Sequence, residues 1–145
     1  MKIAVAGTGY VGLVTGVCLA EHGHNVVCVD VDEEKVAKMS KGISPIYEPG
    51  LDDLMIKNME RLTFTTDYAS AYKDAEVIFI GVGTPEKKDG SANLTYVYKV
   101  AEQIAENAEN DCIVVIKSTV PIGTNDKVEA FITEKAKDGI SIHIA

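Results

Sequence analysis

Lys-Ile-Ala-Val-Ala at residues 2–6 runs directly into Gly-Thr-Gly-Tyr-Val-Gly at residues 7–12. The first segment is a short apolar run that is typical of a strand buried on both faces. In the second segment, Gly7 would make a tight turn, Gly9 would admit a pyrophosphate and Gly12 would let a helix approach the strand. This junction therefore predicts a phosphate-binding turn between a strand and a helix, which is the start of a dinucleotide-binding unit.

The helix after this turn is predicted over residues 10–22, where apolar residues are nearly continuous. Backbone N–H groups near Tyr10 and Val11 would then face the phosphates at the positive end of the helix. A glycine turn with no ligand and the similar loop of methyltransferases are the alternatives to this interpretation. The rest of the chain has to decide between them.

Strands and helices alternate along the whole chain. Strands are predicted at residues 2–6, 25–31, 63–66, 76–82, 112–117 and 140–145. Helices are predicted at residues 10–22, 33–41, 51–59, 67–73, a long segment after 93, and 124–137. Such alternation requires parallel strands joined by right-handed helical crossovers. The predicted fold is a doubly wound α/β, mostly parallel six-stranded Rossmann sheet with helices on both faces and strand order 3-2-1-4-5-6.

Ligands of this fold bind at the carboxyl ends of the strands. Asp30 ends the second predicted strand, roughly 20 residues after the glycine turn, where an acid reaches the hydroxyls of an adenosine ribose. A carboxylate there would repel a 2′-phosphate, so NAD is favoured over NADP. Asp32 competes for this role but is better placed to cap the next helix. Lys35, one turn into that helix, is either a second ribose contact or a solvated surface lysine.

Two further loops place hydroxyl groups at strand ends. Gly-Thr-Pro at 83–85 follows the fourth predicted strand, and Ser-Thr-Val-Pro at 118–121 follows the fifth. Thr84 or Thr119 alone could simply cap a helix or form a turn. Both together, with Ser118 beside them, favour contacts along the expected path of the cofactor.

Composition limits the class of protein. The chain has 145 residues, 46% of them hydrophobic, and a net charge of −8, which suits one domain and disfavours a nucleic-acid partner. Glycines interrupt the apolar start, which excludes a signal peptide, and no apolar run reaches the roughly 18 residues of a membrane span. Cys18, Cys28 and Cys112 are expected to be buried, reduced thiols, as in a cytoplasmic protein. No residues have metal-ligand spacing, so no metal is expected.

Six motifs in order resemble the UDP-glucose/GDP-mannose dehydrogenase family. They are Gly-Thr-Gly-Tyr-Val-Gly-Leu at 7–13, Val-Asp-Val-Asp-Glu-Glu-Lys at 29–35, Ser-Pro-Ile-Tyr-Glu-Pro-Gly-Leu at 44–51, Gly-Thr-Pro at 83–85, Asp-Gly-Ser-Ala-Asn-Leu-Thr-Tyr-Val at 89–97 and Lys-Ser-Thr-Val-Pro-Ile-Gly-Thr at 117–124. The resemblance implies a two-step, NAD-dependent oxidation of a sugar-nucleotide alcohol to a carboxylate through a cysteine-bound intermediate. By the same resemblance Val11, Asp30, Lys35, Thr84 and Thr119 contact the cofactor.

The family's catalytic glutamates, lysine, asparagine and cysteine are expected beyond Ala145. Residues 1–145 are therefore predicted to be the NAD-binding Rossmann domain of a longer enzyme, inactive alone and without catalytic residues. The resemblance favours UDP-glucose as the substrate, with GDP-mannose or UDP-N-acetylmannosamine as alternatives, and implies a homodimer for the full-length enzyme. A non-catalytic NAD-sensing module is the competing hypothesis from another functional class.

Overall fold

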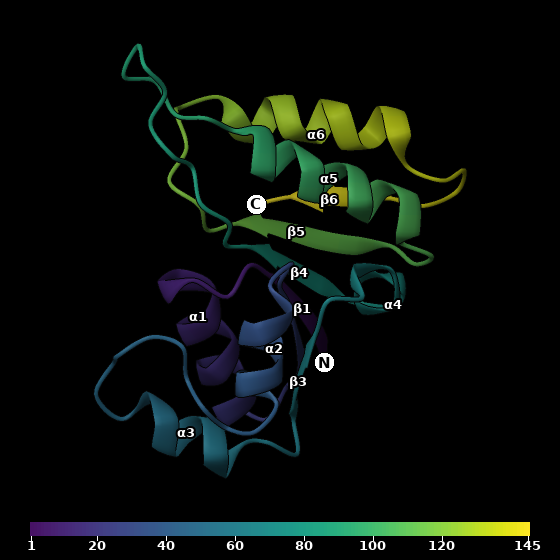
Figure 1. Cartoon of the computed structure of the whole chain (residues 1–145). Coiled ribbons are helices and arrows are strands. Elements are labelled where there is room, and N and C mark those ends of the chain that lie inside the picture. Colours follow the sequence, from purple (N-terminus) through teal and green to yellow (C-terminus); the bar gives the residue numbers. More distant parts are fainter.

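In the computed structural model, which describes residues 1–145, six strands form one parallel sheet (Figure 1). Its order is β3-β2-β1-β4-β5-β6, and each neighbouring pair is parallel. The strands are β1 (Lys2–Ala6), β2 (Asn25–Val29), β3 (Leu62–Thr65), β4 (Val77–Ile80), β5 (Cys112–Ile116) and β6 (Ile142–Ile144). The predicted doubly wound α/β fold and its strand order are confirmed.

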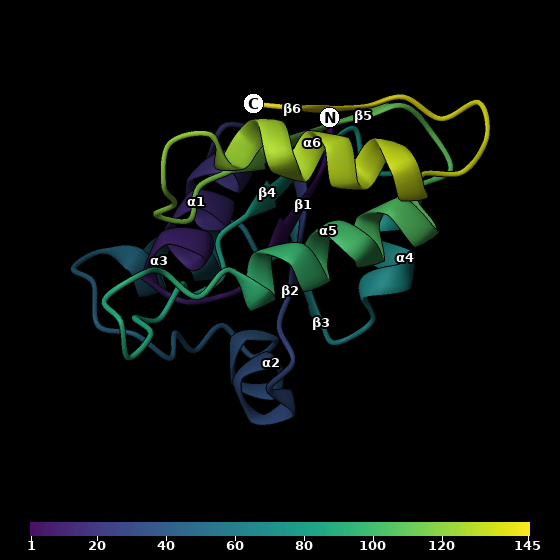
Figure 2. The same cartoon turned by 90° about the horizontal axis from the view of Figure 1, so that it is seen from above.

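Helices cover both faces of this sheet (Figures 1 and 2). One face carries α1 (Tyr10–Glu21), α2 (Glu33–Met39) and α3 (Leu51–Lys57). The other carries α4 (Tyr68–Lys73), α5 (Thr95–Asn107) and α6 (Thr124–Lys135). None of these helices combines the length and apolar character that a membrane crossing requires.

Two hydrophobic cores lie on opposite sides of the sheet. In β1, Ile3 and Val5 belong to the core under α1, while Ala4 and Ala6 belong to the core under α5. This division follows from the two-residue period of a strand. Because both faces of β1 are buried, every residue of the strand after Lys2 is apolar.

The end of β2 differs from the prediction. The strand stops at Val29 rather than continuing to residue 31, and Val31 is exposed. The cause is local, because the Asp30 carboxylate accepts the backbone N–H of Asp32 at 2.9 Å and turns the chain toward α2. Asp30 therefore lies just beyond the strand and not within it.

The expectation of three buried cysteines was wrong for Cys18. Cys28 and Cys112 are buried, but Cys18 is exposed on α1. Helical periodicity explains the error, since Leu13, Val17 and neighbours three or four residues apart form the inward face of α1. An apolar residue between those positions points to solvent, and a nearly continuous apolar helix conceals which face is buried.

Three glycines bring the backbones of β1, α1 and β4 together. Gly7 has a left-handed φ of 93°, which L side chains rarely adopt. A Cβ at Gly12 would lie 2.0 Å from the Gly7 carbonyl oxygen, and a Cβ at Gly81 would lie 3.0 Å from the Gly12 Cα. No side chain fits between these backbones, so the N-terminus of α1 is held at the carboxyl ends of β1 and β4.

We expect Gly12→Ala to lower the free energy of unfolding by about 3 kcal/mol or more, because the clash is with backbone and cannot be relieved by a rotamer change. Gly9→Ala is the matched control, since a Cβ there meets nothing within 4 Å. Its cost should stay below about 1 kcal/mol. Urea unfolding of both variants measures the difference, and equal stabilities would contradict the close approach.

Candidate functional site

A cleft of about 740 Å³ lies at the carboxyl ends of β1, β2 and β4. The glycine turn and the end of β2 form one side of it, and residues of α4 and α5 form the other. Its lining residues are Ala6, Gly7, Thr8, Gly9, Val29, Asp30, Val31, Lys35, Thr66, Tyr68, Tyr72, Gly81, Val82, Gly83, Tyr96, Lys99, Val100 and Gln103. Gly7, Gly9, Asp30 and Lys35, which the sequence singled out separately, are therefore brought into one cleft.

The glycine turn has the form that an anion needs. Gly9 is exposed, and the space where its Cβ would stand is open to at least 4 Å. The N–H groups of Tyr10 and Val11 begin α1 and have no hydrogen-bond partner within the chain. Such free N–H groups at the positive end of a helix bind phosphate oxygens. The geometry of the turn thus fits a pyrophosphate, and Gly12 lies buried behind it.

Asp30 is held by donors from three directions. Its Oδ2 atom accepts the N–H of Thr8 at 3.1 Å, the hydroxyl of Thr8, and the ammonium of Lys35 at 3.3 Å. Its Oδ1 atom accepts the N–H of Asp32 at 2.9 Å. The side chain is only 11% exposed. The carboxylate therefore has a fixed orientation at the edge of the cleft.

The charge of Asp30 is stabilised by these contacts. Burial alone would raise its pKa, but the hydrogen bonds from Thr8 and Asp32 and the positive charge of Lys35 outweigh burial and hold the pKa below its ordinary value. The side chain is thus ionised at neutral pH. An ionised carboxylate in this position accepts hydroxyl groups and repels phosphate.

The neighbours of Asp30 have distinct roles. Asp32 caps α2, as predicted, by accepting the N–H groups of Glu34 at 3.0 Å and Lys35 at 3.2 Å. Lys35 is not simply solvated, since its ammonium pairs with Asp30 and its side chain is 32% exposed. The structure places Lys35 at the same corner of the cleft as Asp30.

The loops after β4 and β5 are joined directly. The Thr84 hydroxyl donates to the carbonyl oxygen of Thr119 at 2.9 Å, and the Ser118 hydroxyl donates to that of Val82 at 2.7 Å. The predicted hydroxyl residues therefore meet at one part of the sheet edge, but they do not line the cleft beside Asp30. Ser118 uses its hydroxyl to hold the two loops together. Thr84 and Ser118 are partly buried, whereas Thr119 is exposed.

Two contacts of the glycine turn could not be foreseen from spacing. Thr8 is completely buried and bonds to Asp30, although its own motif position is unrestricted. The Tyr10 hydroxyl donates to the Glu48 carboxylate at 2.5 Å, which ties the segment before α3 to the start of α1 and raises the pKa of Tyr10. The only signal for the second contact was the motif at residues 44–51, whose role the sequence left unassigned.

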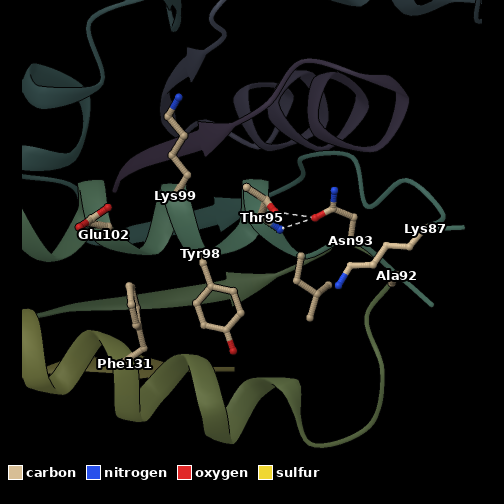
Figure 3. Close-up of a pocket in the computed structure, with 9 residues that line it drawn as sticks. Lys87, Ala92, Asn93, Thr95, Tyr98, Lys99, Glu102 and Phe131 are labelled. Atoms are coloured by element: carbon tan, nitrogen blue, oxygen red, sulfur yellow. Dashed lines mark hydrogen bonds between the residues drawn. The ribbon is translucent and has the colours of Figure 1, made fainter. Parts of the chain in front are cut away.

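A second cavity of about 760 Å³ lies between the segment before α5 and helix α6. Figure 3 shows Tyr98 and Phe131 turned toward each other from α5 and α6; their ring centroids are 5.2 Å apart at 83°. Asn93 accepts the Thr95 N–H at 3.0 Å and so orders the start of α5. These contacts pack and cap helices, and none of the predicted site residues lies there.

Comparison with known proteins agrees with this geometry. The family model described as the UDP-glucose/GDP-mannose dehydrogenase family, NAD binding domain, matches residues 1–145. The chain belongs to this family. NAD is therefore the cofactor of this domain, and the methyltransferase alternative is excluded.

Relatives and solved structures support the same assignment. The chain is 53% identical over 147 aligned positions to UDP-glucose 6-dehydrogenase YwqF of Bacillus subtilis, covering 100% of this chain and 33% of that protein. A UDP-glucose dehydrogenase from Pyrobaculum islandicum superposes with a TM-score of 0.92 at 36% identity, covering 98% of this chain and 34% of that one. A GDP-mannose dehydrogenase from Pseudomonas aeruginosa gives 0.85 at 37% identity, covering 99% and 35%. The chain spans about a third of the length of the relatives it matches.

The lowered pKa of Asp30 predicts a pH-dependent stability. Ionised Asp30 stabilises the fold above the unfolded-state pKa of about 3.9, and this contribution is lost as the pH falls through the lower folded-state pKa. The free energy of unfolding of the wild type should therefore exceed that of Asp30→Asn by more at neutral pH than at about pH 3. Urea unfolding across this range measures the gap.

A gap between the wild type and Asp30→Asn that stays constant with pH would show that the Asp30 contacts do not favour the ionised form.

Proposed function

We propose that this domain binds NAD along the carboxyl edge of the sheet, with the pyrophosphate over Gly9 and the adenosine ribose on Asp30. The single observation that carries the proposal is the shared cleft, where the open space over Gly9 and the oriented Asp30 carboxylate lie together. Gly7 and Gly12 support the turn, and the free N–H groups of Tyr10 and Val11 would hold the phosphates.

The other half of the dinucleotide would follow the edge toward β5. Thr84, Ser118 and Thr119 meet there in adjoining loops. The exposed hydroxyl of Thr119 would be available to the cofactor. The hydroxyl of Thr84 holds the backbone carbonyl group of Thr119 in place. We place the redox-active end of the cofactor at these loops because an extended dinucleotide must cross from β1 to β4 at the switch point of the sheet.

We further propose that the full-length enzyme oxidises UDP-glucose to UDP-glucuronate with two NAD. The support is the 53% identity to the UDP-glucose 6-dehydrogenases of Bacillus subtilis and Rhizobium meliloti. Bound NAD would supply the hydride acceptor for each step, and Asp30 and the glycine turn of this domain would hold and orient it. GDP-mannose and UDP-N-acetylmannosamine are the alternative substrates.

The nucleophile of the second oxidation would lie outside residues 1–145. Burial raises the pKa of Cys28 to about 12 and that of Cys112 to about 11, which suppresses the thiolate that attack requires. Cys18 is exposed, but it does not line the cleft. All three thiols are free, which fits the proposed cytoplasmic location. The homodimer of the full-length enzyme stays a prediction.

We expect the chain to bind NAD more tightly than NADP, because Asp30 attracts ribose hydroxyls and repels a phosphate of about −1.5 to −2 charges. Asp30→Asn should narrow this preference. Calorimetry with each cofactor measures the ratio of affinities, and equal affinities for the wild type would contradict the assignment of Asp30.

Gly9→Val is the control that locates the pyrophosphate. The fold tolerates a Cβ at this position, since nothing lies within 4 Å of it. A valine side chain would nevertheless occupy the proposed place of the phosphates. If a folded Gly9→Val variant still bound NAD, the pyrophosphate could not lie over the glycine turn.

The 145-residue chain should form no NADH above background when mixed with UDP-glucose and NAD. Hydride transfer requires the alcohol carbon to be held against the nicotinamide, and the second oxidation requires a reactive thiolate. Absorbance of NADH at saturating substrate tests this, with calorimetry confirming that NAD is bound. Sustained turnover would mean that one of the three cysteines present is the nucleophile.

A further inference from the structure

We propose that the buried hydroxyl of Thr8 is a positioning group, which orients the Asp30 carboxylate and thereby sets the preference for NAD over NADP. This inference rests on the proposed function and names a residue that determines its specificity. Thr8 itself would not touch the cofactor. It would act only through Asp30.

The burial of Thr8 is the first observation. Thr8 is 0% exposed, although Gly9 and Tyr10, which follow it, are exposed. A buried hydroxyl requires a hydrogen-bond partner, and here that partner is a carboxylate. The backbone N–H of Thr8 donates to the same Oδ2 atom at 3.1 Å. Thr8 therefore donates two hydrogen bonds to one oxygen of Asp30. A hydrogen bond to an ionised acceptor is stronger than one between two neutral groups.

The distribution of donors is the second observation. Three donors meet Oδ2, two from Thr8 and one from Lys35, whereas Oδ1 accepts only the Asp32 N–H. A carboxylate oxygen has room for about two strong donors. Oδ1 is therefore the atom that can accept a further hydrogen bond. The two hydrogen bonds from Thr8 to Oδ2 determine which way Oδ1 faces.

Lys35 cannot replace Thr8 in this role. Its ammonium lies 3.3 Å from Oδ2, its side chain is 32% exposed, and a lysine has many rotamers. The Thr8 hydroxyl sits on a buried, β-branched side chain, which has few alternatives. Lys35 therefore contributes a positive charge near the Asp30 carboxylate, and Thr8 fixes the orientation of that carboxylate.

Loss of the hydroxyl should weaken the discrimination between the cofactors. Without it, the carboxylate keeps the Thr8 N–H, the Asp32 N–H and the Lys35 ammonium but loses its buried hydroxyl donor, so its orientation beside the ribose 2′ position is less tightly fixed. The ribose hydroxyls of NAD would then lose an oriented hydrogen-bond acceptor. The 2′-phosphate of NADP would be repelled less, because the Asp30 carboxylate could turn away from it. The affinity for NAD should then fall more than the affinity for NADP.

The test is calorimetry of Thr8→Val with NAD and with NADP, because valine is nearly isosteric and lacks the hydroxyl. We expect the affinity for NAD to fall about five- to tenfold and the NAD:NADP ratio to narrow severalfold. Thr8→Ser retains the hydroxyl and should retain the ratio. Thr8→Ala, which also lacks the hydroxyl, serves if the valine variant does not fold.

Thr124→Val is the matched control. Thr124 is also buried, at 3% exposed, and its hydroxyl donates to the Pro121 carbonyl oxygen at 2.7 Å, remote from Asp30. This variant loses a comparable buried hydrogen bond, so any general loosening of the domain would appear in it too. Its NAD:NADP ratio should equal that of the wild type.

NMR titration of the Asp30 carboxyl group, without cofactor, supplies a second readout. Removal of the hydroxyl should raise the pKa of Asp30 in Thr8→Val and leave it low in Thr8→Ser. An unchanged ratio and an unchanged pKa in Thr8→Val would overturn the inference while leaving NAD binding intact. A wild type that binds neither dinucleotide would overturn the proposed function and, with it, the role of Thr8 in specificity.

Discussion

The backbone contact among Gly7, Gly12 and Gly81 is the constraint on which the cofactor edge depends. The Gly7 carbonyl oxygen occupies the place of a Cβ at Gly12, and the Gly12 Cα lies 3.0 Å from the place of a Cβ at Gly81. Helix α1 is thereby pinned with its N-terminus at the ends of β1 and β4. Its free N–H groups consequently face the switch point of the sheet, where this fold binds its ligands. Side chains at any of these positions would push the helix away and misdirect those donors.

Most of the fold was predictable because its signals are local. Alternating apolar segments and glycine turns predict parallel strands with helical crossovers, and the order β3-β2-β1-β4-β5-β6 follows. The role of Gly81 was not predictable, because the backbone that it approaches is far away in sequence. The exposure of Cys18 was missed since an almost wholly apolar helix does not reveal its inward face. The early end of β2 depends on a side-chain contact of Asp30 that composition does not encode.

The site was predictable only where a backbone requirement selects the residue type. Glycines at fixed spacing and an acid after the second strand are requirements of this kind. Thr8 was not, because the motif accepts any residue there and its burial is a tertiary property. The same holds for the pairing of Tyr10 with Glu48, which joins two segments that no periodicity relates. Tertiary packing determines which side chains around a site contact one another. A sequence can therefore indicate the residues of such a network but not the contacts between them.

The net charge of −8 opposes the approach of an anionic dinucleotide at long range, and local geometry overcomes this opposition. Charges separated by more than about 8 Å are largely screened at physiological salt. The pyrophosphate would meet the N–H groups of Tyr10 and Val11 at contact distance, and Lys35 offsets part of the charge of Asp30. Acidic residues farther than this from the pyrophosphate act only through screening solvent. The domain can therefore be strongly acidic overall and still bind an anion, and the unbalanced part of the Asp30 charge is felt only by a group that comes as close as a 2′-phosphate.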